Sequence, residues 1–176
     1  MSENIVYTKT VQLSTSAAII DAWTYFFTPF DFTKSLVLTD LPPYYQATIR
    51  ITILSPGGTA RVGTLVVGTS FYLGITQQGA SVGITSYSKK VTDDFGNITI
   101  TKRGYSKRFT GDTFFDMLML DGVQNILTLY KDIPVVWIGT EYGYSALVLY
   151  GFYKSFSINI AGPNHCICSL DLEGLV

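Results

Sequence analysis

The feature that most constrains this chain is a two-residue alternation of apolar and polar side chains, which recurs along much of its length. The alternation is regular in residues 46–54. One face there carries Ala47, Ile49, Ile51 and Ile53, and the other carries Thr48, Arg50 and Thr52. Successive side chains of a strand point to opposite faces, so this pattern predicts a half-buried antiparallel strand. Chains with this periodicity fold into sheets that bury one face.

Further strands are predicted at 62–67, 134–139, 147–160 and 166–172. The segments 86–92 and 97–103 flank the turn sequence Asp93–Gly96 and predict a hairpin. In 147–160, the pattern places Phe152, Phe156, Ile158 and Ile160 inward and Tyr153, Ser155, Ser157 and Asn159 outward. In the last strand, Cys166, Cys168, Leu170 and Leu172 share one face, opposite Asp171 and Glu173.

Helical spacing is clear only near residues 121–131. Asp121 and Gln124 resemble a capping box there, and Pro134 ends the helix. Residues 15–26 are a second helix candidate. Many strands and few helices predict a mainly β fold, an antiparallel β-sandwich of jelly-roll type. We expect residues 1–40 to form an N-terminal arm or helical segment and residues 41–176 the sandwich domain.

The composition favours association with other molecules. Charged residues make up 14% of the chain, against about 25% in ordinary soluble proteins. Aromatic residues also make up 14%, with 12 Tyr and 11 Phe. A surface with few charges and many aromatic side chains is prone to associate. Tyrosine and phenylalanine are also enriched in interface cores. The alternative reading is a single large β-core. The net charge of -1 gives no long-range field that would attract nucleic acid.

Residues that could carry chemistry are few. His165 neighbours Cys166 and Cys168, but structural zinc needs a second ligand pair, so the cysteines are interpreted as small buried hydrophobes. No nucleophile elbow or phosphate-binding loop occurs in the sequence. We therefore expect no catalytic residue, no metal and no cofactor. The amino-terminal residues show no secretion-signal pattern, and the longest apolar stretch, 146–153, is far shorter than the ~20 residues that span a bilayer.

Two groups of residues are candidate contact sites. Lys102, Arg103, Lys107 and Arg108, with Tyr105 among them, form the densest charge on the chain. They favour a strand edge or a salt-bridging interface over a nucleic-acid site. Tyr142 and Tyr144 fall in a predicted loop, as interface residues or as a sugar-stacking platform. Trp137 lies in an apolar run that favours the core.

Several segments together show a resemblance to a protein family. They are 47–53, 61–68, 73–76, 79–84, 87–90, 94–97, 103–108, 136–139, 150–154 and 169–175. This succession of glycine turns and strand faces resembles tail proteins of tailed bacteriophages. The resemblance implies a virion component of the tail tip, baseplate or fibre-attachment region, assembled in the host cytoplasm. It also implies β-sandwich modules that form ring-like homo-oligomers and contact other tail proteins. The alternative function is a carbohydrate-binding module for a bacterial surface glycan.

Overall fold

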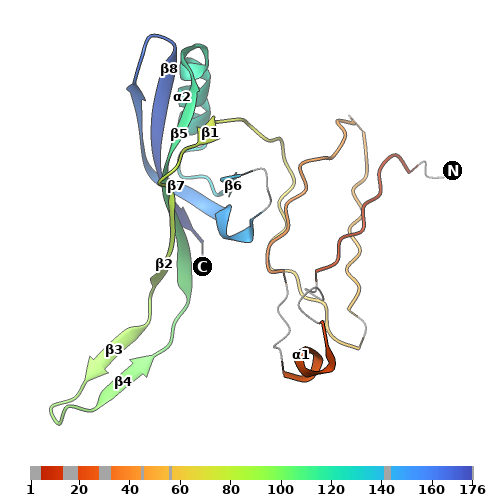
Figure 1. Ribbon diagram of the computed structural model, residues 1–176, viewed down its shortest axis with the longest axis vertical. Coiled ribbons are helices and arrows are strands. Elements are labelled where there is room, and N and C mark those ends of the chain that lie inside the picture. Colours follow the sequence, from red (N-terminus) through yellow and green to blue (C-terminus); the bar gives the residue numbers. More distant parts are fainter. Residues whose placement is uncertain are drawn as a thin grey trace. The chain divides into compact units, whose positions relative to one another are not determined.

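The computed structural model describes residues 5–13, 20–27, 33–44, 46–55, 57–140 and 144–175. The chain divides into two compact units, Met1–Ser70 and Phe71–Val176. The expected division into an arm at residues 1–40 and a sandwich domain at residues 41–176 stays a prediction. Figure 1 shows the elements of both units.

The chain is mainly β, all strand pairs are antiparallel, and one substantial helix is present, as the sequence predicts. The strands are β1 (Ile75–Thr76), β2 (Ser81–Ser86), β3 (Lys89–Thr92), β4 (Ile98–Thr101), β5 (Tyr105–Asp116), β6 (Val135–Ile138), β7 (Val148–Ile160) and β8 (His165–Gly174). The helices are α1 (Ala22–Phe27) and α2 (Leu120–Leu129), and the 3-10 turns are η2 (Met117–Met119) and η3 (Ser145–Leu147).

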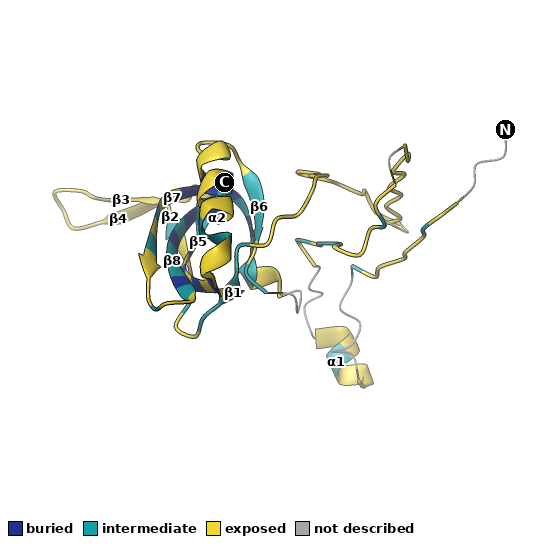
Figure 2. Ribbon diagram, turned by 90° about the horizontal axis from the view of Figure 1, so that it is seen from above, coloured by how far each residue is buried: buried dark blue, intermediate teal, exposed yellow. Residues whose placement is uncertain are grey.

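One curled sheet dominates the second unit. Its order is β1-β5-β8-β7-β6, with β2 also paired to β5, while β3 and β4 form a separate two-stranded sheet. The curl brings the two ends of the main sheet together, because the Thr76 hydroxyl donates a 2.7 Å hydrogen bond to the carbonyl of Gly139, just after β6. The sandwich-like layering thus comes from one sheet bent over its own core, with α2 at the centre of the curl (Figure 2).

The core lies between α2 and the inner face of this sheet. The strands contribute Phe109, Phe115, Leu149, Tyr153, Cys166, Cys168, Leu170 and Leu172, and the helix contributes Val123 and Leu127. All four alternating residues predicted on β8 are buried. A polar contact fixes the helix over the sheet, because the buried Tyr153 hydroxyl donates to the backbone carbonyl of Leu127 at 2.8 Å. Removal of this apolar surface from water is the main term holding the unit together.

The beginning of α2 differs from the predicted capping box. The helix runs from Leu120 to Leu129, and Asp121 lies inside its first turn. The side chain that caps the preceding η2 turn belongs to Asp116, whose carboxylate accepts a 2.8 Å hydrogen bond from the Leu118 amide. The sequence pattern placed the cap at Asp121. The helical turns already begin at η2, one turn before the position that the apolar spacing indicates.

The predicted faces of β7 were wrong in part. The register between β7 and β8 shifts between Tyr153 and Ser155, which marks a β-bulge. A bulge inserts one unpaired residue. The residues that point inward therefore change from odd-numbered positions before the bulge to even-numbered positions after it. Tyr153 is therefore buried rather than outward, while Phe156 and Ile158 pack against the core as predicted. Ile160, expected to face inward, is exposed.

The segments 46–54 and 62–67 are extended but belong to no strand, so these two strand predictions were wrong for this structure. Ile49, Ile51 and Ile53 are exposed. Alternation defines two faces, but a strand also needs a neighbour that completes its backbone hydrogen bonds. In the same unit, the short helix α1 begins where the Asp21 carboxylate accepts a 2.7 Å hydrogen bond from the Thr24 amide. Residues 14–19, in the first part of the predicted helix 15–26, lie outside the described residues.

Candidate interface

The feature of the second unit that most resembles a functional site is a projecting hairpin, here defined as residues 87–104. It contains β3, β4 and the turn between them, and it extends β2 and β5 away from the curled sheet (Figures 1 and 2). Every residue from 86 to 105 is exposed. An isolated two-stranded hairpin is marginally stable in water. The projecting hairpin is therefore an element that gains stability when another surface covers it.

The turn of the projecting hairpin is built around Asp93. Its carboxylate accepts hydrogen bonds from the amides of Phe95 and Asn97 at 3.0 and 2.7 Å, and from the Asn97 side chain at 2.9 Å. The side-chain and backbone donors of Asn97 lower the pKa of the Asp93 carboxyl. Gly96 takes a φ of 82°, a left-handed conformation that glycine adopts without strain. The turn predicted from Asp93–Gly96 is confirmed, and it holds Phe95 at the tip.

The two faces of the projecting hairpin are chemically different. Lys90 lies opposite Ile100, and Thr92 lies opposite Ile98. Directly opposed residues of an antiparallel pair share a face, so both isoleucines lie on one side. Phe95 at the tip is 91% exposed. Phenylalanine is typical of interface cores, whereas lysine is depleted there and suits a polar rim.

The base of the projecting hairpin is anchored to the body of the unit. The Tyr87 hydroxyl donates a 2.8 Å hydrogen bond to the Glu173 carboxylate and lies 3.0 Å from the hydroxyl of the buried Ser106. Lys154 completes the cluster through a 2.6 Å ion pair with Glu173. The Lys154 ammonium and the Tyr87 hydroxyl lower the pKa of the Glu173 carboxyl. This cluster fixes the direction in which the hairpin leaves the sheet.

The four basic residues singled out from the sequence occupy two different environments. Lys102 and Arg103 are exposed at the base of the projecting hairpin. Lys107 donates to the carbonyls of Ser145 and Val148, at 3.1 and 3.3 Å, and so ties β5 to the start of β7. Arg108 pairs with Asp171 of β8 at 3.3 Å. Lys107 and Arg108 thus contact their own sheet, whereas Lys102 and Arg103 are exposed.

The two tyrosines of the predicted loop are only partly described. Tyr142 lies outside the described residues. Tyr144 precedes η3, its carbonyl accepts from the amide of Leu147, and its side chain is exposed. Trp137 belongs with the core residues, as predicted. Its indole donates to the Gly151 carbonyl at 3.1 Å, and its ring meets Tyr153 edge to face.

The cysteines and the histidine do not form a metal site. Among the described residues, no group of three or more His, Cys, Asp or Glu could hold a metal ion. Cys166 and Cys168 are buried and free. Burial, together with the charge of Asp112, raises the pKa of the Cys168 thiol to about 11. That thiol is therefore neutral and unreactive at physiological pH.

A shallow groove of about 460 Å³, lined by both polar and apolar residues, lies on the outer face of the sheet. Its polar lining residues include Ser81, Thr110, Asp112, Ser155, Ser157 and Ser169. The hydroxyl and carboxylate groups come from β2, β5, β7 and β8. Sequence reasoning missed this groove because it joins strands that are distant in the chain. The only signal was the row of small polar residues on the outward faces.

Sequence reasoning also understated how much apolar surface is exposed. In the first unit the exposed large side chains include Trp23, Phe26, Leu54, Leu65 and Val67.

No helix among the described residues is long and apolar enough to cross a membrane. Comparison with known proteins finds no family model and no curated sequence that matches this chain.

Proposed function

We propose that this protein is a structural component of a phage tail, in the tail tip, baseplate or fibre-attachment region, and that it acts by packing against copies of itself and other tail proteins. Its role is geometric rather than catalytic. The curled sheet is the rigid body, and the exposed segments are the contact surfaces. The virion tail is its proposed location, after assembly in the host cytoplasm.

The observation that carries the assembly role is the amount of exposed surface. Large apolar side chains are exposed in both units, among them Trp23 and Leu65 in the first and Phe95 and Leu118 in the second. The large interfaces of permanent assemblies are rich in such side chains. Much of the exposed surface belongs to large apolar side chains. Monomeric proteins rarely leave such patches uncovered.

The placement in a phage tail rests on the resemblance described above. The segments that carry it include the turn 94–97, the basic segment 103–108 and the end of β8 at 169–174. In the structure these segments form the tip of the projecting hairpin, its base, and the strand that anchors it. They are thus parts of one feature, the one most suited to contact a neighbour.

The assembly role is tested by the mass of the full-length protein in solution. Native mass spectrometry and light scattering over a concentration series should give an oligomer of defined copy number. Electron microscopy of virions should locate the chain in the tail. A protein that stays monomeric at high concentration, without dye-binding apolar surface, contradicts the assembly role. An oligomer that never occurs in virions contradicts only the placement in a tail.

A second candidate function is recognition of a bacterial surface glycan, which the polar side chains in the shallow groove favour. Sugars bind through hydroxyl and carboxylate partners such as Asp112 and Ser157. A glycan array with the full chain tests this function. Binding should disappear in Asp112→Ala and persist in Lys131→Ala, because Lys131 does not line the groove. No binding to any glycan contradicts the second candidate and leaves the assembly role standing.

A further inference from the structure

The projecting hairpin and its base concentrate positive charge. Of the 12 basic residues in the chain, six lie between residues 89 and 108: Lys89, Lys90, Lys102, Arg103, Lys107 and Arg108. The first four belong to the projecting hairpin and are exposed, and its only acidic residues are Asp93 and Asp94 at the turn. The exposed Phe95, Ile98 and Ile100 lie among these charges. The hairpin is therefore an apolar surface with a positive rim.

A surface of opposite charge lies where β5 runs into η2 and α2. We call it the β5 end, and it comprises Asp112, Phe114, Asp116, Met117, Leu118 and Asp121. All six residues are exposed, and Leu118 is 94% exposed. His165 pairs with Asp116 across the sheet, and its ring contacts that of Phe114. The alternation of β5 places Asp112, Phe114 and Asp116 on its outer face, and Leu118 and Asp121 follow beyond its end, so the β5 end carries exposed apolar side chains and three carboxylates.

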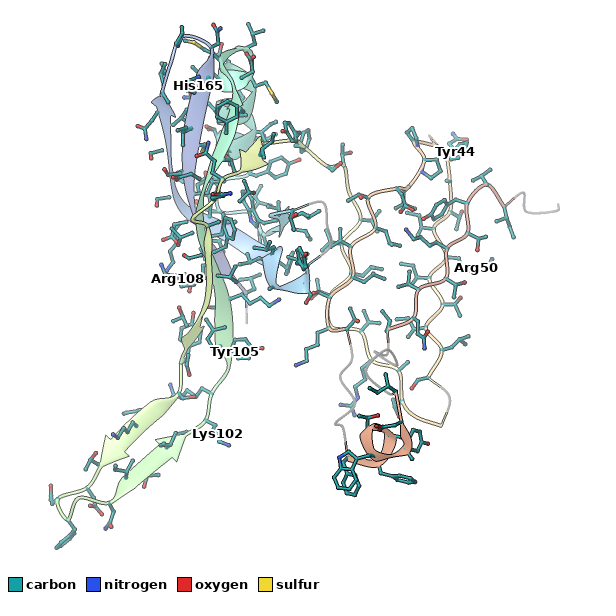
Figure 3. All side chains as sticks on the ribbon, in the orientation of Figure 1. Tyr44, Arg50, Lys102, Tyr105, Arg108 and His165 are labelled. Atoms are coloured by element: carbon teal, nitrogen blue, oxygen red, sulfur yellow. The ribbon has the colours of Figure 1, made fainter. Side chains whose placement is uncertain are left out.

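The two surfaces lie at opposite ends of one strand. β5 has 12 residues, so its ends are separated by up to about 36 Å at ~3.3 Å per residue. Figure 3 shows this order, with Lys102, Tyr105, Arg108 and His165 following one another from the hairpin to the far end of the sheet. The anchor formed by Tyr87 and Glu173 directs the hairpin away from the body. The hairpin therefore cannot reach the β5 end of its own chain.

We infer that the projecting hairpin of one copy docks on the β5 end of a second copy. Phe95 and the isoleucine face cover Phe114 and Leu118, while Lys90, Lys102 and Arg103 face Asp112 and Asp121. The contact is head-to-tail, because two different surfaces meet. Head-to-tail contacts close into rings or extend into filaments. This inference rests on the proposed assembly role and names the surfaces that carry it.

A second copy is the occupant because the complementary charges are on the same chain. The net charge is only -1, yet the exposed Lys89, Lys90, Lys102 and Arg103 lie near one end of β5, and the exposed Asp112, Asp116 and Asp121 lie at or beyond its other end. Complementary charges steer association and fix the register of a contact, and like charges in the same place oppose it. Exposed charges are also screened by salt, so the association should weaken as ionic strength rises.

Charge reversal of the full-length protein tests the inference. The hairpin variant carries Lys90→Glu, Lys102→Glu and Arg103→Glu. The β5-end variant carries Asp112→Lys and Asp121→Lys, and it keeps Asp116 because that carboxylate caps η2. The control variant carries Lys34→Glu, Arg61→Glu and Lys131→Glu, three exposed basic residues outside both surfaces. Circular dichroism checks that each variant is folded, and light scattering and native mass spectrometry report the association.

Each reversed variant alone should associate more than tenfold more weakly than the unmodified protein, while the control keeps its oligomer. A mixture of the hairpin and β5-end variants should recover the association, since each then meets an opposite charge. If the unmodified protein is oligomeric and neither reversal weakens it, the inference fails and the assembly role stands. If the mixture of two folded variants does not recover association, the pairing of these surfaces is wrong. A monomeric unmodified protein contradicts both.

Discussion

At the scale of single residues, a few contacts decide how α2 is held against the sheet of the second unit. Tyr153 sits beside a bulge in β7, and its ring is covered by Trp137 and Phe156. Its hydroxyl reaches the carbonyl of Leu127 near the end of α2. That carbonyl is one of the last in the helix and lacks a partner further along the chain. One side chain therefore supplies apolar contact to the sheet and a hydrogen bond to the helix.

Replacement of this hydroxyl gives the first prediction. Tyr153→Phe leaves a buried carbonyl without its partner, so the free energy of unfolding should fall by about 0.5–1.5 kcal/mol. Denaturant unfolding measures this change. Tyr105→Phe is the matched control, because Tyr105 is exposed in β5 and should change stability very little. Equal stability of the two variants would contradict the structural role of the Tyr153 hydroxyl.

At the scale of elements, α2 and the projecting hairpin represent opposite cases. α2 buries Val123 and Leu127 and owes its place to tertiary packing. The projecting hairpin buries nothing and depends on its turn and on cross-strand pairs. The helix should therefore unfold together with the sheet, whereas the isolated hairpin opens locally at low cost.

Two leucines of α2 provide a matched pair for the second prediction. Leu127 is 1% exposed and Leu129 is 69% exposed. Leu127→Ala creates a cavity under the helix and should lower the free energy of unfolding by about 2–5 kcal/mol. Leu129→Ala should change it by less than about 0.5 kcal/mol. Thermal and denaturant unfolding of the two variants test whether α2 covers the core, and similar losses in both would show that it does not.

The turn of the projecting hairpin gives a pH prediction. The folded turn lowers the pKa of Asp93 below the ordinary value of 3.8. A lowered pKa means that Asp93 stabilises the turn fully above its unfolded pKa, and that this contribution is lost as the pH falls through the folded pKa. The amide resonance of Asn97 in an NMR titration should therefore shift with a midpoint below 3.8. The transition should be absent in Asp93→Asn. A midpoint at or above the ordinary pKa of aspartate would contradict the role of the Asp93 carboxylate in the turn.

At the scale of the whole molecule, exposed apolar surface is the dominant property. It occurs in both units, and includes Trp23 and Leu65 in the first and Phe95 and Leu118 in the second. In each unit, these apolar side chains are left uncovered by the rest of that unit. Such surface favours association until it is buried.

This property predicts how the protein binds an environment-sensitive dye. An anilinonaphthalene dye should fluoresce strongly with the protein at high dilution, because the dye binds accessible apolar surface. The fluorescence per chain should fall as the concentration rises and assembly covers that surface. Fluorescence titration at constant dye measures this effect, with light scattering on the same samples. A signal per chain that stays constant while oligomers form would show that the apolar surface lies outside the interfaces.

The sequence by itself determined the elements in which local pattern and final burial agree. β8 was predictable because its cysteines and leucines alternate without interruption, and both its neighbours leave that alternation intact. The hairpin followed from its Asp93–Gly96 turn, and α2 followed from its apolar spacing. In each case the physical cause is local, either a backbone conformation at a turn or a period that matches the element.

Only the tertiary structure decided the rest. The central strand β5 went unpredicted because its inward positions include Gly111 and Thr113 and its outward ones carry charge, so no apolar alternation marks it. The β7 bulge reversed the facing of Tyr153, since register belongs to a strand pair and not to one strand. The regular alternation of residues 46–54 formed no strand, because backbone pairing needs a neighbouring edge that the local sequence does not specify.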